Sequence, residues 1–258
     1  MQFGVIGGTG FYRLADDGGG GGRVEVETAY GAVVVNRVRF GEEEVAFIAR
    51  HGAGHGIPPH RVNYRGNIAA LKSLGVTNIL ASAAVGSLVK TMPPGALAIL
   101  TQFIDFTRGR PSTFFDGEGG EVVHVDVSEP YCPHLREELK KAAEALGEEV
   151  HPEATYVCAE GPRFETPAEI RMFRQMGSDL VGMTSVPEAV LAREACMCYA
   201  SVAIVTNWAA GVSAEPVEHG RVSDFMGRQT PRVRALFEAE IGAHREIDCS
   251  CRTWANKA

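Results

Sequence analysis

The sequence predicts an α/β fold, in which a single domain is built around a central mixed, largely parallel sheet flanked by helices. Two observations support this prediction. From residue 58 onward, apolar runs alternate with segments of helical periodicity, as in the strand–helix units of a parallel sheet. Before that point, three short runs at 24–27, 33–39 and 45–49 are separated by turn residues and indicate an antiparallel meander. The 258 residues, 45% hydrophobic and 22% charged, suffice for one such globular domain.

The first strand is expected at residues 2–6 and leads into the glycine-rich stretch Gly7–Gly10. Glycines let backbone N–H groups approach an anion closely, so this stretch suits either a dinucleotide or a single phosphate. A dinucleotide fold requires a helix directly after the glycine turn and then an acidic residue that holds the ribose. Here five more glycines, 18–22, and the meander follow, so we favour a smaller ligand.

The elements after the meander have recognisable boundaries. Gly75 ends a helix, and Thr166 with Glu169 forms a capping pattern that begins another. Ser185–Glu188 repeats that pattern, and Thr230-Pro231 is expected to open the last helix. The expected helices span about 61–74, 134–146, 185–195 and 230–246, with one more after Thr166. The expected strands span 76–82, 97–103, 155–159, 179–183 and 199–206.

The net charge of −7 and the isoelectric point near 5.7 argue against nucleic acid as the main partner, because a polyanion requires a basic surface. A small anion can still bind to local basic residues and backbone dipoles. No signal peptide and no apolar run of membrane-spanning length are found, which predicts a cytoplasmic protein without a membrane partner.

The six cysteines fall into two groups. Cys132, Cys158, Cys196 and Cys198 lie in or beside apolar segments, and we expect buried free thiols there. Cys249-Ser-Cys251 lies in residues 248–258, which we expect to be a polar tail after a domain of residues 1–247. This pair is a weak metal signal, because no second pair completes four ligands. A stabilising or redox-active disulfide is an alternative.

Three histidines, His51, His55 and His60, invite comparison with a metal site. The glycines between them make a helix improbable, and no carboxylate or cysteine lies nearby in the sequence. We therefore expect no metal here. A serine hydrolase is also disfavoured, because the chain contains no G-x-S-x-G elbow.

Polar or glycine-rich segments follow several of the predicted strands, and ligands collect at the carboxyl ends of strands in such sheets. These segments are Gly7–Gly10, Arg50-His51, Ala83–Ser87, Met183-Thr184 and Asn207. Each has a simpler explanation when taken alone, since Thr9 fits a turn, Arg50 a surface ion pair and Thr184 a helix cap. Together they predict a pocket whose arginine, histidine, hydroxyls and helix N-termini suit a phosphate.

Six segments in the same order resemble the methylthioadenosine phosphorylases of the trimeric purine nucleoside phosphorylase family. The resemblance runs from about residue 3 to about residue 213. The segments are Arg50–Gly52, Pro59–Asn67, Val85–Leu88, Glu160–Phe164, Gly182–Glu194 and Cys198–Ser201.

The resemblance implies phosphorolysis, in which inorganic phosphate attacks C1′ of a purine nucleoside and releases the free purine. It implies 5′-methylthioadenosine or 5′-methylthioinosine as substrate, phosphate as co-substrate, no metal or organic cofactor, and a homotrimer or dimer of trimers. The implied phosphate ligands are Thr9, Arg50, His51, Ala84 and Thr184, and the implied substrate contacts are Phe164, Met183, Asn207, Ala209 and His124. Asn207 and His51 are the implied catalytic residues. His124 would reach the 5′ end of the substrate in a neighbouring subunit, beside residues 217–225.

Two positions depart from the adenine-specific members of the family. Asn207 stands where those members carry aspartate, and an amide can donate to a 6-oxo group while it accepts from protonated N7. This predicts a preference for hypoxanthine or guanine nucleosides. Ala83 stands where relatives commonly place a phosphate donor, which predicts weak phosphate binding unless Ser82 compensates. The alternatives are a general phosphorylase for inosine and guanosine, and a ligand-binding protein with little turnover.

Overall fold

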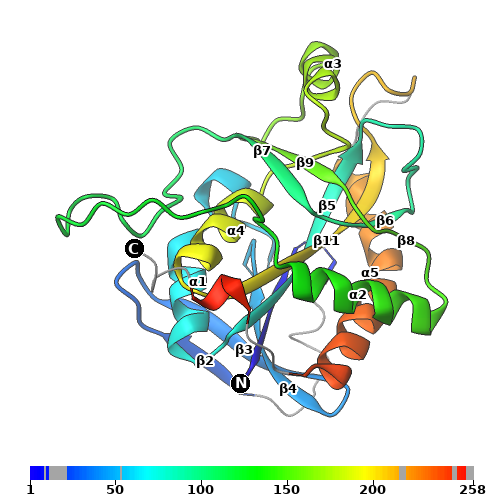
Figure 1. The fold of residues 1–258 in the computed structure, drawn as a ribbon. Helices are drawn as coiled ribbons and strands as arrows, with labels where there is room; N and C mark the ends of the chain where they lie inside the picture. Colours follow the sequence, from blue (N-terminus) through cyan, green and yellow to red (C-terminus); the bar gives the residue numbers. More distant parts are fainter. Residues whose placement is uncertain (9, 12–21, 53, 215–218, 246–248, 254–258) are drawn as a thin grey trace.

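The computed structural model describes the chain except residues 9, 12–21, 53, 215–218, 246–248 and 254–258, and describes only the backbone of residues 219–224. Within the described residues, eleven strands form one mixed sheet that five α-helices flank (Figure 1). Six of its ten strand pairings are parallel. The predicted α/β class is thereby confirmed.

The strands are β1 (Phe3–Gly7), β2 (Arg23–Val26), β3 (Val33–Phe40), β4 (Glu43–Ala49), β5 (Asn78–Ser87), β6 (Leu97–Ile99), β7 (Gln102–Phe106), β8 (Val150–His151), β9 (Thr155–Ala159), β10 (Leu180–Gly182) and β11 (Cys198–Trp208). The α-helices are α1 (Tyr64–Ser73), α2 (Pro133–Leu146), α3 (Pro167–Gln175), α4 (Ser185–Glu194) and α5 (His219–Ala243). Two 3₁₀ turns, η2 (Pro59–Arg61) and η3 (Ser250–Arg252), complete the described elements.

Strand β5 is the centre of the sheet. It pairs in parallel with β1 and, along its whole length, with β11, while its last residues pair antiparallel with β10. The expected end of this strand at Ser82 is therefore wrong, because the small residues Ala83–Ser87 continue the pairing with β11. The expected strand at 97–103 is two strands, β6 and β7, which pair with different neighbours. The antiparallel meander of β2, β3 and β4 is confirmed.

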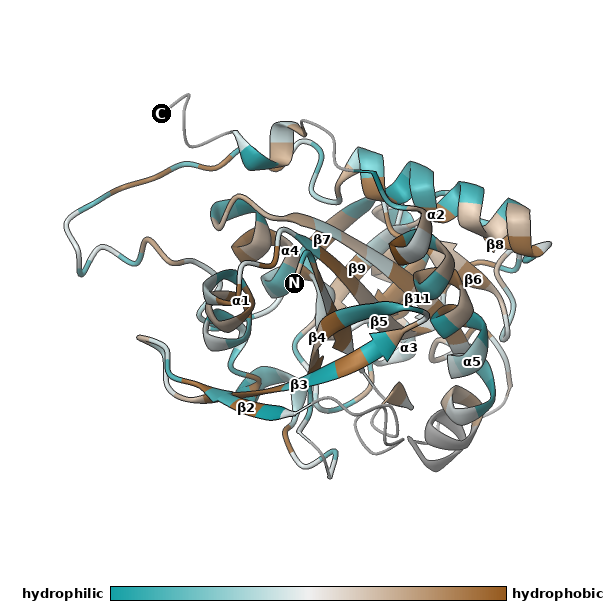
Figure 2. Ribbon diagram, turned by 90° about the horizontal axis from the view of Figure 1, so that it is seen from below, coloured by the Kyte–Doolittle hydropathy of each residue, from teal (hydrophilic) through white to brown (hydrophobic). Residues whose placement is uncertain are grey.

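The helices cover the two faces of the sheet in pairs. Alternate residues of β5 separate the two cores: Ile79 packs in the core that α1 and α4 cover, and Leu80 packs in the core that α2 and α5 cover. Figure 2 shows apolar strands in the centre and hydrophilic stretches on the helices around them. This layering leaves the ends of the parallel strands open for a site.

One predicted helix start and one predicted capping pattern are wrong. Helix α5 begins at His219, well before the expected Thr230-Pro231, and Pro231 lies inside it. The Thr230 hydroxyl donates to the carbonyl oxygen of Met226 at 2.8 Å, so a side chain supplies a hydrogen bond next to the position where proline has no N–H. Helix α4 has no side-chain cap from Thr184, and Glu188 contacts other residues. The capping box of Thr166 and Glu169 is confirmed.

The segment expected to be a polar tail carries two buried cysteines among its described residues. Cys249 and Cys251 are 8% and 1% exposed and pack in the core between α2, α5 and the sheet. Of the other four cysteines, Cys132, Cys158 and Cys198 are buried as expected, Cys196 is only partly buried, and none is joined in a disulfide. Among the described residues, no helix has both the length and the apolarity to cross a membrane.

Candidate active site

A cavity of about 380 Å³ opens where β1, β4, β10 and β11 end, beside the last residues of β5. Eight of the predicted site residues line it: Arg50, His51, Ala84, Phe164, Met183, Thr184, Asn207 and Ala209. Thr9 lies outside the described residues. His124 is exposed and does not line this cavity. The sequence therefore located the cavity, and the structure shows how its side chains are held.

Arg50 follows β4 and forms a buried ion pair. Its Nε and Nη2 atoms donate to the two carboxylate oxygens of Glu188 at 2.5 and 2.9 Å, and Nη1 donates to the carbonyl oxygen of Ser82 at 2.9 Å. Both side chains are almost fully buried. Burial lowers the pKa of Arg50, but the attraction of Glu188 outweighs it and the net pKa is raised. The guanidinium is fixed in orientation with N–H groups left for a ligand.

Glu188 was not expected in the site, since the sequence pattern placed it in a helix cap. Its carboxylate also accepts a hydrogen bond from the Tyr199 hydroxyl at 2.8 Å. The acid that pairs with Arg50 is therefore buried in helix α4 rather than at the surface. A buried acid beside a predicted binding arginine cannot be found from spacing, because 138 residues separate the two.

The glycine loop after β1 is packed tightly against this pair. A Cβ atom at Gly8 would lie 2.8 Å from Nη1 of Arg50, and one at Gly7 would lie 2.6 Å from the Cβ of Phe11. The Gly8 N–H donates to the Ser82 hydroxyl at 3.2 Å. The described part of this loop thus gives close approach to Arg50, and the N–H of Gly8 holds Ser82 rather than a ligand.

His51 has a defined ring orientation. Its Nδ1 lies 2.7 Å from the carbonyl oxygen of Ile57, which can only accept, so Nδ1 carries the proton. The Nε2 atom of the neutral ring is then an acceptor, and it becomes a donor when the ring is protonated. His51 can therefore meet either an O–H of a monoprotonated anion or, once charged, an anionic oxygen.

Helix α4 directs its first turn toward the cavity through Thr184. The N–H of Thr184 donates to the Tyr156 hydroxyl at 3.0 Å, so the side-chain hydroxyl is the group left for a ligand. The positive end of the α4 dipole adds a favourable field for an anion. Ala84 lines the same end of the cavity.

Ala83 is packed in the core under α1 and α4 and is not among the residues that line the cavity. The idea that this position lacks a phosphate donor is therefore not supported by the placement of its side chain. Ser82, the expected substitute, is fully buried and holds Gly8 and Arg50. It acts on the site through these two residues.

Asn207 also lines the cavity and is positioned by a β-bulge. The pairing of β11 with β5 shifts between Val205 and Asn207, which turns the side chain out of the ladder. The amide Nδ2 donates to the carbonyl of Trp208 at 2.8 Å, and Oδ1 accepts from the Thr206 hydroxyl at 2.8 Å. Because the Trp208 carbonyl only accepts, the amide orientation is fixed, with one N–H and one lone pair remaining.

Glu165 is a lining residue that the sequence interpretation missed. Its Oε1 is buried and has no hydrogen-bond partner among the described residues. Burial raises the pKa of this carboxyl, and the charge of Glu169 adds to the rise. A buried acceptor without a donor is costly in the free protein, so it is positioned to accept an N–H from a ligand. The signal in the sequence that could have identified Glu165 is its position directly after Phe164, a predicted substrate contact.

Arg110 holds the loops around the middle of the cavity. Its guanidinium donates to the carbonyl oxygens of Met183 and Glu160 and to the hydroxyl of Tyr64. The carbonyl of Met183 is thus occupied, which leaves its N–H and side chain for the expected ribose contact. Phe164 lines the cavity and is 38% exposed, which leaves part of its ring accessible for stacking against a ligand. Arg110 was not predicted from the sequence either, because no recognisable motif surrounds it there.

His51, His55 and His60 do not belong to any group of three or more possible metal ligands among the described residues. In the part of the chain that the structure describes, the one group of possible metal ligands consists of four cysteines remote from this cavity. His51 and His55 lie with their ring centres 4.9 Å apart at the cavity, and His60 does not line it.

The residues that line the cavity define a class of protein. It is an α/β enzyme that binds a small anion next to a planar ligand with both hydrogen-bond donors and acceptors. The comparisons with known proteins agree. Residues 2–241 match the model of the Phosphorylase superfamily. The chain therefore belongs to this superfamily, and within it is a purine nucleoside phosphorylase, a pentosyltransferase.

Three known proteins illustrate what this chain is similar to in sequence and structure. The "6-oxopurine nucleoside phosphorylase" of Pyrococcus furiosus is 51% identical over 96% of this chain and 95% of its own length. The "Probable S-methyl-5'-thioinosine phosphorylase" of Methanopyrus kandleri is 50% identical over 96% of each chain. The methylthioadenosine phosphorylase of Schistosoma mansoni, solved with adenine, superposes with a TM-score of 0.89 at 36% identity, covering 95% and 93% of the two chains.

Proposed function

We propose that the chain phosphorolyses nucleosides of 6-oxopurines, namely hypoxanthine and guanine, in preference to adenine nucleosides. The observation that carries this proposal is that Glu165 and Asn207 line one cavity, with a buried carboxylate oxygen at Glu165 that lacks a donor. Relatives at about half identity bear the names of 6-oxopurine and thioinosine phosphorylases, which supports the same base class.

The argument rests on complementary hydrogen bonding. A 6-oxopurine carries an N–H at N1, which a carboxylate accepts, whereas adenine carries a lone pair at N1, which a carboxylate repels. The remaining N–H of Asn207 can donate to the 6-oxo group, and its remaining lone pair can accept from protonated N7. A site with buried hydrogen-bonding groups rejects the mismatched base strongly, since those groups would be left unpaired.

The proposed reaction places phosphate at the Arg50 end. Phosphate, held by Arg50, His51, Ala84 and Thr184 together with Thr9, forms a bond from oxygen to C1′ as the C1′–N9 bond breaks. The electron pair of that bond moves to the purine, which takes a proton from solvent at N7, and the phosphate group releases its remaining acidic proton to solvent. Asn207 stabilises the leaving base, and the aligned phosphate stabilises the positive charge that develops on the sugar. The products are the free base and a pentose 1-phosphate.

The proposal predicts a distinct pattern in a panel of substrates. Inosine, guanosine and methylthioinosine should be cleaved, and adenosine and methylthioadenosine should be cleaved at least 10-fold less efficiently in kcat/KM. Comparison of inosine with methylthioinosine then establishes which 5′ group is preferred. The residues 217–225 expected beside that group lie largely outside the described side chains. Faster cleavage of the adenine nucleosides would contradict the base assignment, and thermal shifts without product would favour a binding protein.

The substitution Glu165→Gln tests the carrying observation directly. Loss of a charged hydrogen bond costs about 1.5–3 kcal/mol, so kcat/KM for inosine should fall about 10- to 100-fold. The value for methylthioadenosine should not fall with it. Glu153→Gln is the matched control, because Glu153 is exposed and does not line the cavity. Equal losses for both bases in Glu165→Gln would show that the carboxylate does not read the base.

We also propose a trimer or a dimer of trimers. Residues 107–132 contain no helix or strand, and Figure 1 shows much of this segment leaving the body of the molecule. His124 is exposed on it, and Val122 is 77% exposed, which suits a surface covered by another subunit. Analytical ultracentrifugation tests this, and a monomer at micromolar concentration would contradict it. None of the six cysteines is joined in a disulfide, which suits the reducing cytoplasm that we propose as the compartment.

A further inference from the structure

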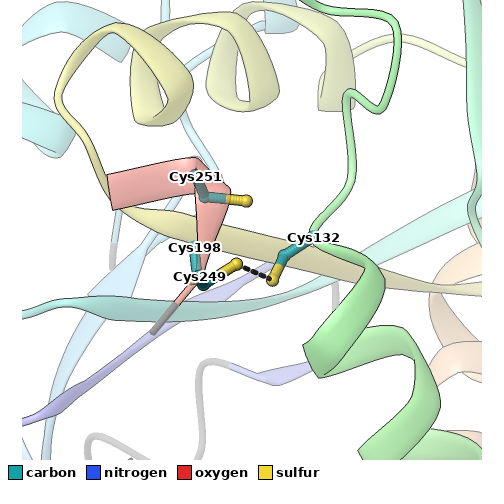
Figure 3. Close-up of side chains that lie close together, drawn as sticks. All are labelled: Cys132, Cys198, Cys249 and Cys251. Carbon is teal, nitrogen blue, oxygen red and sulfur yellow. Dashed lines mark hydrogen bonds between the residues drawn. The ribbon is translucent and has the colours of Figure 1, made fainter. Parts of the chain in front are cut away.

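Four cysteines meet at the start of β11, whereas the active-site cavity lies at the other end of that strand. The Sγ atoms of Cys132, Cys198, Cys249 and Cys251 all lie within 4.8 Å of one another (Figure 3). All four are buried, and Cys132 and Cys249 are separated by 3.5 Å between sulfur atoms. The second cysteine pair that the sequence interpretation found missing is thus supplied by the fold.

We propose that these four cysteines form a structural Zn²⁺ site with tetrahedral thiolate coordination. Zn–S bonds of about 2.3 Å place the sulfur atoms of such a site about 3.8 Å apart, which matches the spacing of this cluster. All four positions around the ion are filled by protein, as in structural sites and unlike catalytic ones, which keep one position open.

The ligands are held on rigid elements. Cys132 is the N-cap of α2, and its N–H donates to the carbonyl of Tyr199 at 2.8 Å, next to Cys198 on β11. The N–H of Cys198 donates to the carbonyl of Thr77 at 2.9 Å. These backbone hydrogen bonds therefore hold Cys132 and Cys198 in place independently of the end of the chain.

The other two ligands come from one short turn. Cys249 precedes the 3₁₀ turn η3, and the N–H of Arg252 donates to the Cys249 carbonyl at 2.9 Å. This turn directs both sulfur atoms to the same point, as Figure 3 shows. A metal bound there would fasten the end of the described chain to α2 and β11.

Charge near the cluster favours thiolates. Zn²⁺ displaces the protons of all four thiols, and the resulting site carries net negative charge. The N-terminal end of the 14-residue helix α2 lies at Cys132 and adds a favourable dipole.

The site would be structural rather than catalytic. Cys198 begins β11 and Asn207 lies nine residues further along the same strand, which separates the cluster from the base-binding end of the cavity by about 30 Å. None of the four cysteines lines the cavity. The proposal is therefore independent of the proposed substrate.

The test is metal analysis of the full chain purified with a phosphine reductant. Elemental analysis should find about one Zn per chain in the wild type. The metal-free protein, loaded with Co²⁺ without oxygen, should show the sulfur-to-cobalt charge-transfer and visible bands of a tetrahedral tetrathiolate. Cys251→Ser should lose most of the zinc, whereas the matched control Cys196→Ser, outside the cluster, should retain it.

Three results would overturn the proposal: no zinc in the wild type together with no cobalt spectrum, zinc unchanged in Cys251→Ser, or cysteine pairs joined as disulfides. Disulfides are recognised by an intact mass lower by the hydrogens lost and by fewer than the 6 titratable thiols in denaturant with a chelator. If Cys251→Ser fails to fold, the cobalt spectrum of the wild type still decides.

Discussion

The two ends of strand β11 show opposite uses of polar side chains. At the start of the strand, Cys198 is surrounded by three more cysteines, and every sulfur faces another sulfur of the same chain. At the far end, the bulge at Asn207 leaves an N–H and a lone pair directed at a cavity. One end is closed and satisfied by the protein itself, while the other is left unsatisfied for a ligand. The comparison predicts that changes at the two ends separate stability from catalysis.

The largest effect is expected at Arg50, which we propose binds phosphate and which also forms a buried ion pair. Arg50→Met removes the guanidinium and leaves Glu188 buried without its partner. We expect a loss of at least 10³-fold in kcat/KM for phosphate and a destabilisation of about 3–5 kcal/mol. Steady-state kinetics and denaturant unfolding measure the two.

A double variant separates these two consequences. Arg50→Met with Glu188→Gln removes the unpaired buried charge, so part of the stability should return while activity stays low. An unchanged KM for phosphate in Arg50→Met would place the anion elsewhere in the cavity. That result would also contradict the proposed difference between the two ends of β11, one open to a ligand and the other closed.

Metal removal tests the closed end of the strand. If zinc joins α2, β11 and η3, its removal by a strong chelator should lower Tm by about 10 °C. KM for inosine and phosphate at 25 °C should stay within about 2-fold, because the cluster is remote from the cavity. Differential scanning calorimetry with parallel kinetics checks both. A change in KM without a change in Tm would show that the two ends are coupled.

A pH dependence is expected from Glu165. Burial raises the pKa of its carboxyl, so as pH falls through that raised pKa the group protonates and loses its ability to accept N1–H of a 6-oxopurine. The protonated form can instead donate to N1 of adenine. The ratio of kcat/KM for inosine to that for adenosine should therefore fall at acid pH. This dependence should disappear in Glu165→Gln.

The ionised carboxyl of Glu165 should also reduce the stability of the free enzyme. A carboxyl whose folded pKa is raised favours the protonated folded state, so its contribution to stability is lost as pH rises through the folded pKa. At neutral pH, Glu165→Gln should therefore raise Tm by a few degrees while it lowers activity. Thermal unfolding at two pH values tests this, and a lower Tm at neutral pH would contradict the burial argument.

The sequence predicted the cavity better than it predicted the contacts that hold it. Arg50 and Thr184 follow strands and Asn207 lies near the end of one, and strand order alone brings such ends together. Glu188 and the cysteine cluster depend on segments far apart in the chain, which local patterns do not reveal. Pro231 and Ala83–Ser87 misled for another reason: tertiary packing extended a helix and a strand through residues that usually interrupt them.

The smallest effect is expected at Ala83, and it tests whether placement or family pattern predicts function better. Because this side chain packs in the core and not at the cavity wall, Ala83→Thr should leave KM for phosphate unchanged. The buried hydroxyl and added volume should instead destabilise the protein by about 1–3 kcal/mol. Ala83→Val is the matched control, because it adds the same volume without a hydroxyl. A lower KM for phosphate in Ala83→Thr alone would mean that the strand end opens toward the anion when phosphate binds.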